Sequence, residues 1–281
     1  MPKRVVELLT RCGSNGSVLP PTQLYNEGWM LRLVLDWFDR NRTLAHQLSF
    51  LPESRWYSEA LLPSRFLPQR RGDKRAESFT HADGIVGHFS IAPGERGDAR
   101  LLSQPKQFVV IEAKLGSSLS AGTKNAPEYD QAARNVACMA HMLDGIDLTT
   151  IERLGFYVIA PDSQIKAGVF GDLVTRESIC RKVDGRVAEY PDLRDTWFRD
   201  TFEPVLKRID LSILSWESIL EVLPKDEESD GIREFYRLCK QFNPVRVERS
   251  NAPNDPKTES GTIRRALGTE GSKVFQHVLG K

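Results

Sequence analysis

One segment, QFVVIEAKL at residues 107–115, constrains the fold of this chain more than any other. Phe108 to Ile111 are continuously apolar, a pattern typical of a strand that is buried on both faces in the middle of a sheet. A second apolar run, LGFYVIAP at 154–161, ends at Pro161 and predicts another buried strand. Because buried strands need helices against both faces, the two runs predict an α/β protein.

The segments around these strands predict a mixed sheet flanked by helices. Apolar residues over about 23–42 recur at the i, i+3, i+4 spacing of a helix with one buried stripe. The expected order is a helix over about 23–42 with Thr22 as its N-cap, an extended segment over 55–68, a strand over 81–91, a polar loop over 92–106, the strand at 107–115, a helix over about 127–144 and the strand at 154–161.

Beyond residue 161 the pattern is mainly helical. We expect helices over about 165–183, 192–208 and 226–241, with a short strand that turns into a helix at SILSWESILEVL. The polar stretch at 248–262 contains two prolines and is typical of a linker. The chain is therefore expected to divide into an N-terminal lead at 1–21, a core at 22–161, a mainly helical extension at 162–247 and a linker with a C-terminal tail at 248–281.

Charge and cysteine usage exclude several classes of protein. The 39 basic and 38 acidic residues leave a formal net charge of +1, so a nucleic-acid surface would have to be local. Four widely separated cysteines indicate neither a disulfide scaffold nor a zinc knuckle. The N-terminus lacks the apolar core of a signal peptide, and no stretch approaches the ~18–20 apolar residues that cross a bilayer. We therefore expect a cytoplasmic protein without a membrane partner.

Glu112 and Lys114 end the apolar strand and lie two residues apart, so their side chains share one face of the strand. This pairing has two explanations. In the first, the two groups form an exposed ion pair worth ~0–1 kcal/mol, without a function. In the second, carboxylates bind a hard cation such as Mg²⁺ and the lysine steadies an attacking water.

The acid-x-lysine pattern by itself is weak evidence. The chain contains it twice, at Glu112-Ala113-Lys114 and at Asp255-Pro256-Lys257, about as often as chance supplies. The second copy falls in the predicted linker, where we expect no site. The strand context therefore favours the first copy.

That context resembles the PD-(D/E)xK phosphodiesterase superfamily, which has the restriction-endonuclease-like fold. Asp83 in HADGIVG matches the first acid of the motif, and Glu112-Ala113-Lys114 matches its second element. Glu27 in NEGWMLRLVL and Gln131 in YDQAARN match a glutamate and a glutamine that RecB-like members add. The resemblance covers about residues 22–161.

The chain departs from the pattern of that superfamily in two places. The motif helix reads QAARN, without the tyrosine that many RecB-like members carry a few residues after the glutamine. Ala82 stands where the namesake motif has a proline. Both positions vary within the superfamily, so the departures bear on the subfamily more than on the activity.

The resemblance implies a metal-dependent nuclease that hydrolyses phosphodiester bonds, with DNA as the favoured substrate and anti-phage defence or DNA repair as its setting. Mg²⁺ is the implied cofactor, and Mn²⁺ would substitute for it. Asp83, Glu112 and the Ala113 carbonyl are the implied ligands, and Glu27 would complete the metal site. Lys114 would orient the water, while Gln131 would position Lys114 or the scissile phosphate.

Two alternatives stay open. A non-catalytic nucleic-acid-binding or assembly protein could keep this fold, and an RNA-directed nuclease could use the same site because the chemistry is indifferent to the sugar. The residues also have structural explanations: Glu27 as a solvated helix carboxylate, Asp83 as a turn residue and Gln131 as a surface residue.

A cluster of basic residues before Asp83 is the best local source of affinity for nucleic acid, with a solvated basic loop as the alternative. Its members are Arg65, Arg70, Arg71, Lys74 and Arg75. Arg134, three residues after Gln131 on the predicted helix, is a further candidate for a phosphate contact. Nucleic acid is the expected partner, and a protein partner or a second copy of the chain also stays open.

Overall fold

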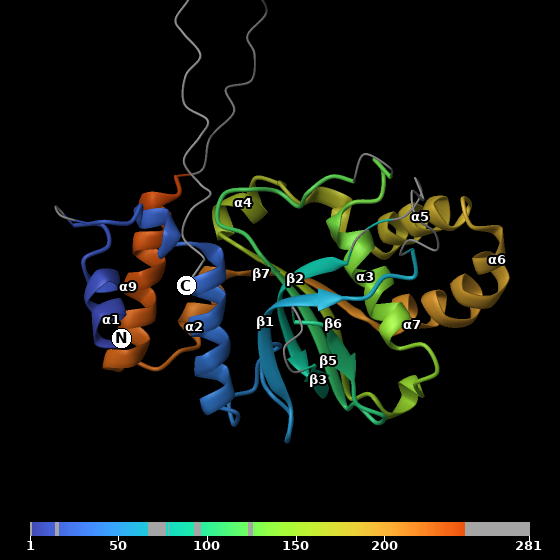
Figure 1. Ribbon diagram of the computed structural model, residues 1–281, viewed down its shortest axis with the longest axis horizontal. Coiled ribbons are helices and arrows are strands. Elements are labelled where there is room, and N and C mark those ends of the chain that lie inside the picture. The colour runs from blue at the N-terminus through green and yellow to red at the C-terminus, as the bar shows by residue number, and fades with distance from the viewer. Residues whose placement is uncertain are drawn as a thin grey trace, which may run out of the picture. The chain divides into compact units, whose positions relative to one another are not determined.

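A five-stranded mixed sheet is the centre of the structure, a computed structural model that describes residues 2–14, 17–66, 77, 79–92, 97–122 and 126–244 (Figure 1). The strands lie in the order β1-β2-β5-β6-β7. Their bounds are Arg55–Leu62 for β1, Thr80–Gly87 for β2, Gln107–Ala113 for β5, Arg153–Ala160 for β6 and Asp210–Ser215 for β7. The predicted α/β class with a mixed sheet is therefore confirmed.

Strand β5 lies in the middle of this sheet, as its apolar run predicts. It pairs antiparallel with β2 on one side and parallel with β6 on the other, and all seven of its residues are buried. Strand β7 continues the sheet in parallel with β6. The segment 162–247 therefore contributes a strand to the same sheet as the segment 22–161.

Helices cover both faces of the sheet (Figure 1). On one face lie α2 (Glu27–Arg40), α8 (Trp216–Glu221) and α9 (Glu227–Phe242), whose apolar residues pack with Val109, Ile111 and Ala113 of β5. The opposite face carries α3 (Gln131–Met142), α5 (Arg176–Val187) and α7 (Glu203–Arg208), which pack with Phe108 and Val110. Successive residues of β5 thus supply two separate cores.

The remaining helical elements lie before and between the main helices along the chain. They are α1 (Pro2–Thr10), the 3₁₀ turns η1 (Pro21–Gln23), η2 (Leu148–Thr150) and η3 (Gly171–Val174), the helices α4 (Asp162–Lys166) and α6 (Pro191–Leu193), and the π-helical stretch η4 (Arg194–Phe202). Among the residues that the structure describes, no helix is both long and apolar enough to span a bilayer.

Helix α2 begins later than its sequence pattern predicts. Its N-cap is Asn26, whose side chain accepts a hydrogen bond from the Trp29 amide at 3.0 Å, so the prediction of Thr22 as N-cap was wrong. Thr22 lies instead in the 3₁₀ turn that starts at Pro21. Threonine and asparagine both cap helices well. Asn26 is the N-cap because its backbone is extended, whereas Thr22 lies inside the turn η1.

The strand predicted over 81–91 is interrupted. Strand β2 ends at Gly87, where φ is 149° and a Cβ would stand 2.1 Å from the Gln107 carbonyl oxygen. The chain then forms a separate two-stranded sheet from β3 (Phe89–Ile91) and β4 (Ala99–Leu101). Strand β4 lies within the segment that was expected to be only a polar loop.

The C-terminal elements follow the prediction except in one place. The prediction of a single helix over about 165–183 was wrong, because this segment is divided among α4, η3 and α5. Thr175 is the N-cap of α5. Residues 192–208 are helical throughout, the strand-to-helix turn appears as β7 and α8, and α9 is present. The predicted linker and tail at 248–281 lie outside the described residues.

Candidate active site

The candidate site forms where strands β2 and β5 separate. Their last ladder pair is Gly84 with Ile111. Asp83 is the residue of β2 just before Gly84, and its Oδ2 atom accepts a hydrogen bond of 2.8 Å from the Ala113 backbone amide. The Asp83 carboxylate thereby takes the place of a backbone acceptor and is held against the end of β5.

Glu112 is completely buried at this strand end, and neighbouring side chains hold both of its oxygens. Its Oε1 atom accepts a hydrogen bond of 2.8 Å from Asn135. Its Oε2 atom accepts one of 2.6 Å from Gln131 and lies 3.3 Å from the Lys114 ammonium. Three donors therefore fix the orientation of one carboxylate.

Lys114 lies between the two acids. Its Nζ atom is 3.3 Å from Glu112 and 3.8 Å from Asp83, and the side chain is almost fully buried. The backbone of Lys114 is held on both sides, because its amide donates to the Ile159 carbonyl at 2.8 Å and its carbonyl accepts from the Trp216 indole at 2.9 Å. These contacts fix the backbone from which the Lys114 side chain extends, and the two acids hold its buried ammonium.

The pKa of Glu112 is raised to about 8, and burial of the carboxyl group is the largest cause. The negative charge of Asp83 is the second cause, and Asp83 also accepts a hydrogen bond from the protonated form of Glu112. The Lys114 charge opposes these effects and lowers the pKa. Two carboxylates that share one lysine thus carry more negative charge than the site neutralises.

Such a buried charged group is poor evidence for a stabilising role. Removing carboxylates and an ammonium from water costs several kcal/mol per ion in real proteins, and their attraction often fails to offset that cost. A buried acid with a strongly raised pKa, such as Glu112, is instead a feature of functional sites. The exposed-ion-pair explanation does not fit Glu112, whose side chain is fully buried.

The donor set suits a hard divalent cation. Asp83, Glu112 and the Ala113 carbonyl offer oxygen atoms, and Mg²⁺ is commonly bound by one or two carboxylates while it keeps several waters. A cation there would relieve the repulsion that raises the pKa of Glu112. Over the described ranges, no three Asp, Glu, His or Cys side chains are close enough to form a metal-binding group.

Glu27 is the first residue of α2 and lies outside any such group. Its neighbour Gly28 faces Glu59, since a Cβ built on Gly28 would be 3.7 Å from Glu59 Oε1. Glu59 belongs to β1, and its chain neighbours Ser58 and Ala60 pair with Gly84 and Ala82 of β2. The half-buried Glu27 carboxylate acts instead on Cys239 of α9, whose thiol pKa is raised first by burial and then by the Glu27 charge. Among the described residues, Glu27 makes no hydrogen bond or ion pair with Asp83, Glu112 or Lys114.

Gln131 begins α3 and links Glu112 to the loop that follows Lys114. Its side-chain Oε1 atom accepts a hydrogen bond of 3.0 Å from the Ser120 backbone amide. Its backbone amide donates a hydrogen bond of 3.0 Å to the Ser120 carbonyl. Arg134 donates to the Ser120 hydroxyl at 2.9 Å. Gln131 and Arg134 are thus tied to the same loop, and Gln131 joins that loop to an acid of the site through its hydrogen bond to Glu112.

Sequence reasoning missed two residues of the site. Asn135 follows Gln131 by four positions, so helical periodicity could have placed it on the same face. Trp216 stands about a hundred residues from Lys114, and no local signal connects the two. Only the packing of α8 against the sheet brings its indole to the Lys114 carbonyl.

The predicted basic cluster is only partly described. Arg65 is exposed in the turn after β1. The pKa of His141 on α3 is lowered mainly by burial of His141 and also by the positive charge of Arg65. The other members, Arg70, Arg71, Lys74 and Arg75, lie outside the described residues.

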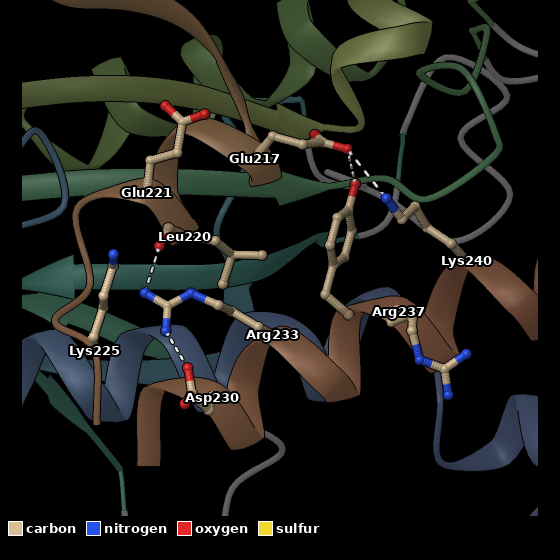
Figure 2. A pocket seen from close by; sticks show the side chains of 9 residues that line it. Glu217, Leu220, Glu221, Lys225, Asp230, Arg233, Arg237 and Lys240 are labelled. Atoms are coloured by element: carbon tan, nitrogen blue, oxygen red, sulfur yellow. Dashed lines mark hydrogen bonds and ion pairs between the residues drawn. The ribbon is translucent and has the colours of Figure 1, made fainter. Parts of the chain in front are cut away.

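A hollow of about 670 Å³ lies between α8 and α9 (Figure 2). Most of its charged groups are paired with one another. Glu217 accepts from the Tyr236 hydroxyl at 2.7 Å and lies 3.6 Å from Lys240, while Arg233 is 2.8 Å from Asp230. The hollow therefore presents mostly paired charges, whereas two carboxylates share a single lysine at the end of β5.

The arrangement at the end of β5 defines a buried carboxylate–lysine site with amide donors. Comparison of the chain with models of known protein families, with curated proteins and with solved structures finds no match. A function for this chain therefore has to be argued from the chemistry of Asp83, Glu112 and Lys114.

Proposed function

We propose that this protein is a divalent-metal-dependent nuclease that hydrolyses phosphodiester bonds, with DNA as its favoured substrate. One observation carries the proposal: Asp83 and Glu112, from neighbouring strands, share the Lys114 ammonium at 3.8 and 3.3 Å. This is the residue set of the PD-(D/E)xK motif, gathered in space from positions 29 residues apart in sequence.

The architecture supports the same proposal. Helix α2 precedes strands β1, β2 and β5, helix α3 follows them, and β6 completes the core in parallel with β5. That order corresponds to the restriction-endonuclease-like core, in which the acids stand at the end of the central strands. Anti-phage defence and DNA repair are the settings in which we expect such an activity.

In the proposed mechanism, Asp83, Glu112 and the Ala113 carbonyl would hold Mg²⁺, or Mn²⁺ in its place. Such an ion would supply charge neutralisation at the phosphate and a lowered pKa of water. Lys114 orients the attacking water through its ammonium, which the hydrogen bond from Trp216 to the Lys114 carbonyl helps to hold in place. Gln131 keeps Glu112 in position, and Glu27 supplies a further negative group at the start of α2.

The proposal is tested with purified full-length protein on plasmid DNA, single-stranded DNA and RNA, in millimolar Mg²⁺ or in EDTA. We expect cleavage that EDTA abolishes and that Glu112→Gln and Lys114→Met each reduce by at least ~100-fold, as loss of a preorganised charged group does. Cleavage of RNA alone would favour the RNA-directed alternative.

Two matched controls accompany these variants. Lys106→Met removes a lysine next to the opposite end of β5, where it pairs with Glu152 at 3.5 Å on the surface. The double variant Asp255→Ala with Lys257→Ala removes the second acid-x-lysine pattern. Both controls should cleave as the wild type does. Binding of nucleic acid without cleavage in any metal would favour the non-catalytic alternative.

A further inference from the structure

Asn135 is a completely buried polar residue of α3 that contacts the candidate site. Its Nδ2 atom donates to Glu112 Oε1 at 2.8 Å and to the Gln131 carbonyl at 3.1 Å. One turn earlier, Gln131 donates to the other carboxylate oxygen at 2.6 Å. Two amides on one helix face therefore hold the two oxygens of the same acid.

The rest of the Asn135 side chain argues against a purely structural role. Its Oδ1 atom is buried and has no hydrogen-bond partner among the described residues. An unpaired buried carbonyl destabilises a fold, and an apolar residue would avoid that penalty. The flanking residues of α3, including Val136 and Cys138, are fully buried in the apolar core. An asparagine at this position is therefore explained by what its amide does for Glu112.

The chemistry of a neutral donor explains why an amide suits this place. Lys114 already supplies one positive charge to Asp83 and Glu112, and a second cationic side chain at position 135 would cancel the negative charge that remains to attract a metal ion. An amide orients the carboxylate and leaves its charge in place. Ligands that are held in this way by surrounding hydrogen bonds bind metals more tightly, because less order has to be created on binding.

We propose that Asn135 is a positioning residue of the metal site, which holds the Glu112 carboxylate in the orientation that binds a divalent cation. This inference rests on the proposed function, and it assigns to Asn135 a task that is separate from catalysis. Its measurable consequence is the affinity of the protein for Mn²⁺ in the absence of nucleic acid.

The test measures the dissociation constant of Mn²⁺ on the full chain, from the electron paramagnetic resonance signal of the free ion. Asn135→Leu keeps a side chain of similar size without a donor, and Asn135→Ser provides a second variant that is too short to reach Glu112. We expect both to weaken Mn²⁺ binding by about tenfold or more.

Cys138→Ala is the matched control. Cys138 is buried on the same helix, but its thiol contacts Thr80 and Ser64. The substitution leaves a cavity and lowers stability, and we expect its Mn²⁺ affinity to stay within about threefold of the wild type. The control thus separates loss of helix packing from loss of carboxylate orientation.

The remaining outcomes are decisive as well. Wild-type affinity in folded Asn135 variants, or an equal loss of affinity in Cys138→Ala, would overturn the inference and leave the nuclease proposal standing. A wild-type protein that binds no Mn²⁺ would overturn the metal site itself. If Asn135→Leu does not fold, Asn135→Ser decides, and failure of both to fold would assign Asn135 to folding instead.

Discussion

The indole Nε1 of Trp216 donates a hydrogen bond of 2.9 Å to the backbone carbonyl of Lys114. Trp216 starts α8 directly after β7, and it is completely buried. The segment that follows residue 161 therefore reaches back to the candidate active site. Its role there is to hold the backbone from which the Lys114 side chain extends.

The first prediction concerns this hydrogen bond. Trp216→Phe keeps the aromatic packing and removes the donor, so we expect a folded protein that is destabilised by about 1 kcal/mol. Because small displacements of an active group cost much in rate, we also expect cleavage to fall by roughly tenfold or more. Denaturant unfolding and single-turnover cleavage measure the two effects.

Trp197→Phe is the matched control for Trp216→Phe. Trp197 is also buried, but its indole nitrogen has no hydrogen-bond partner among the residues described. The control should leave cleavage unchanged. Equal cleavage by Trp216→Phe and the wild type would show that the Lys114 carbonyl needs no such support.

A second prediction concerns metal binding and stability. A cation that binds only the folded protein stabilises it by about 2.7 kcal/mol at ~100 times its dissociation constant. For a chain of this size that corresponds to a rise in melting temperature of roughly 5–10 °C. Thermal melts with Mn²⁺ and with EDTA measure the shift.

Asp83→Asn distinguishes specific from general metal effects in these melts. Its amide oxygen can still accept from the Ala113 amide, while the charge that attracts the cation is removed. We expect the shift in melting temperature to shrink to near zero. A shift as large as that of the wild type would place the bound metal elsewhere.

A third prediction concerns pH. Burial and the neighbouring Asp83 charge raise the pKa of Glu112 to about 8 in the metal-free protein. Since the folded state then binds a proton more tightly than the unfolded state does, this group contributes stability that is fully present below its unfolded pKa of about 4.3 and is lost as the pH rises through 8. We therefore expect metal-free protein to lose stability between pH 5 and pH 9.

Urea unfolding in EDTA at several pH values measures that loss. Glu112→Gln removes the titrating group, so its stability should fall less steeply over the same interval. Glu152→Gln, at an exposed carboxylate, serves as the control and should follow the wild type. Parallel curves for the wild type and Glu112→Gln would contradict the assignment of the pH dependence to Glu112.

A fourth prediction concerns the basic cluster. Neutralising Arg65, Arg70, Arg71 and Lys74 should weaken binding of DNA and reduce the salt slope by about 3–4, because each lost phosphate contact lowers the slope by about 0.9. Cleavage at saturating substrate should be nearly preserved, since the proposed catalytic residues stand at the end of β5 and not in the basic cluster. Fluorescence anisotropy over a range of salt concentrations measures the slope.

The variant Lys225→Gln with Lys240→Gln provides the comparison for the basic cluster. Both lysines line the hollow between α8 and α9 (Figure 2). We expect this variant to bind DNA as the wild type does. An unchanged slope in the first variant together with a reduced slope in the second would move the phosphate contacts to that hollow.

Local sequence pattern determined the central strand and the residues that stand at its end. The apolar run before Glu112 specifies burial on both faces, and β5 is indeed the middle strand, with all its residues buried. The spacing of Glu112 and Lys114 places them on one face, because side chains alternate along a strand. The class of the fold and the candidate acids could therefore be predicted.

Local pattern was insufficient where several residues compete for one role. Thr22 and Asn26 are both capable N-caps, and Asn26 prevails because η1 already includes residues 21–23. The strand expected over 81–91 ends at Gly87 because the chain there passes too close to Gln107 for a side chain. Such choices depend on neighbours that sequence spacing does not reveal.

Tertiary structure alone decided how the acids are held. The pairing of β2 with β5 brings Asp83 to the Ala113 amide, and the packing of α3 brings Asn135 to Glu112. Trp216 reaches Lys114 only because β7 joins the sheet beside β6. The spacing of apolar residues in the sequence indicates which face of a helix or strand is buried. Contacts between elements that are distant in sequence depend on how those buried faces pack together.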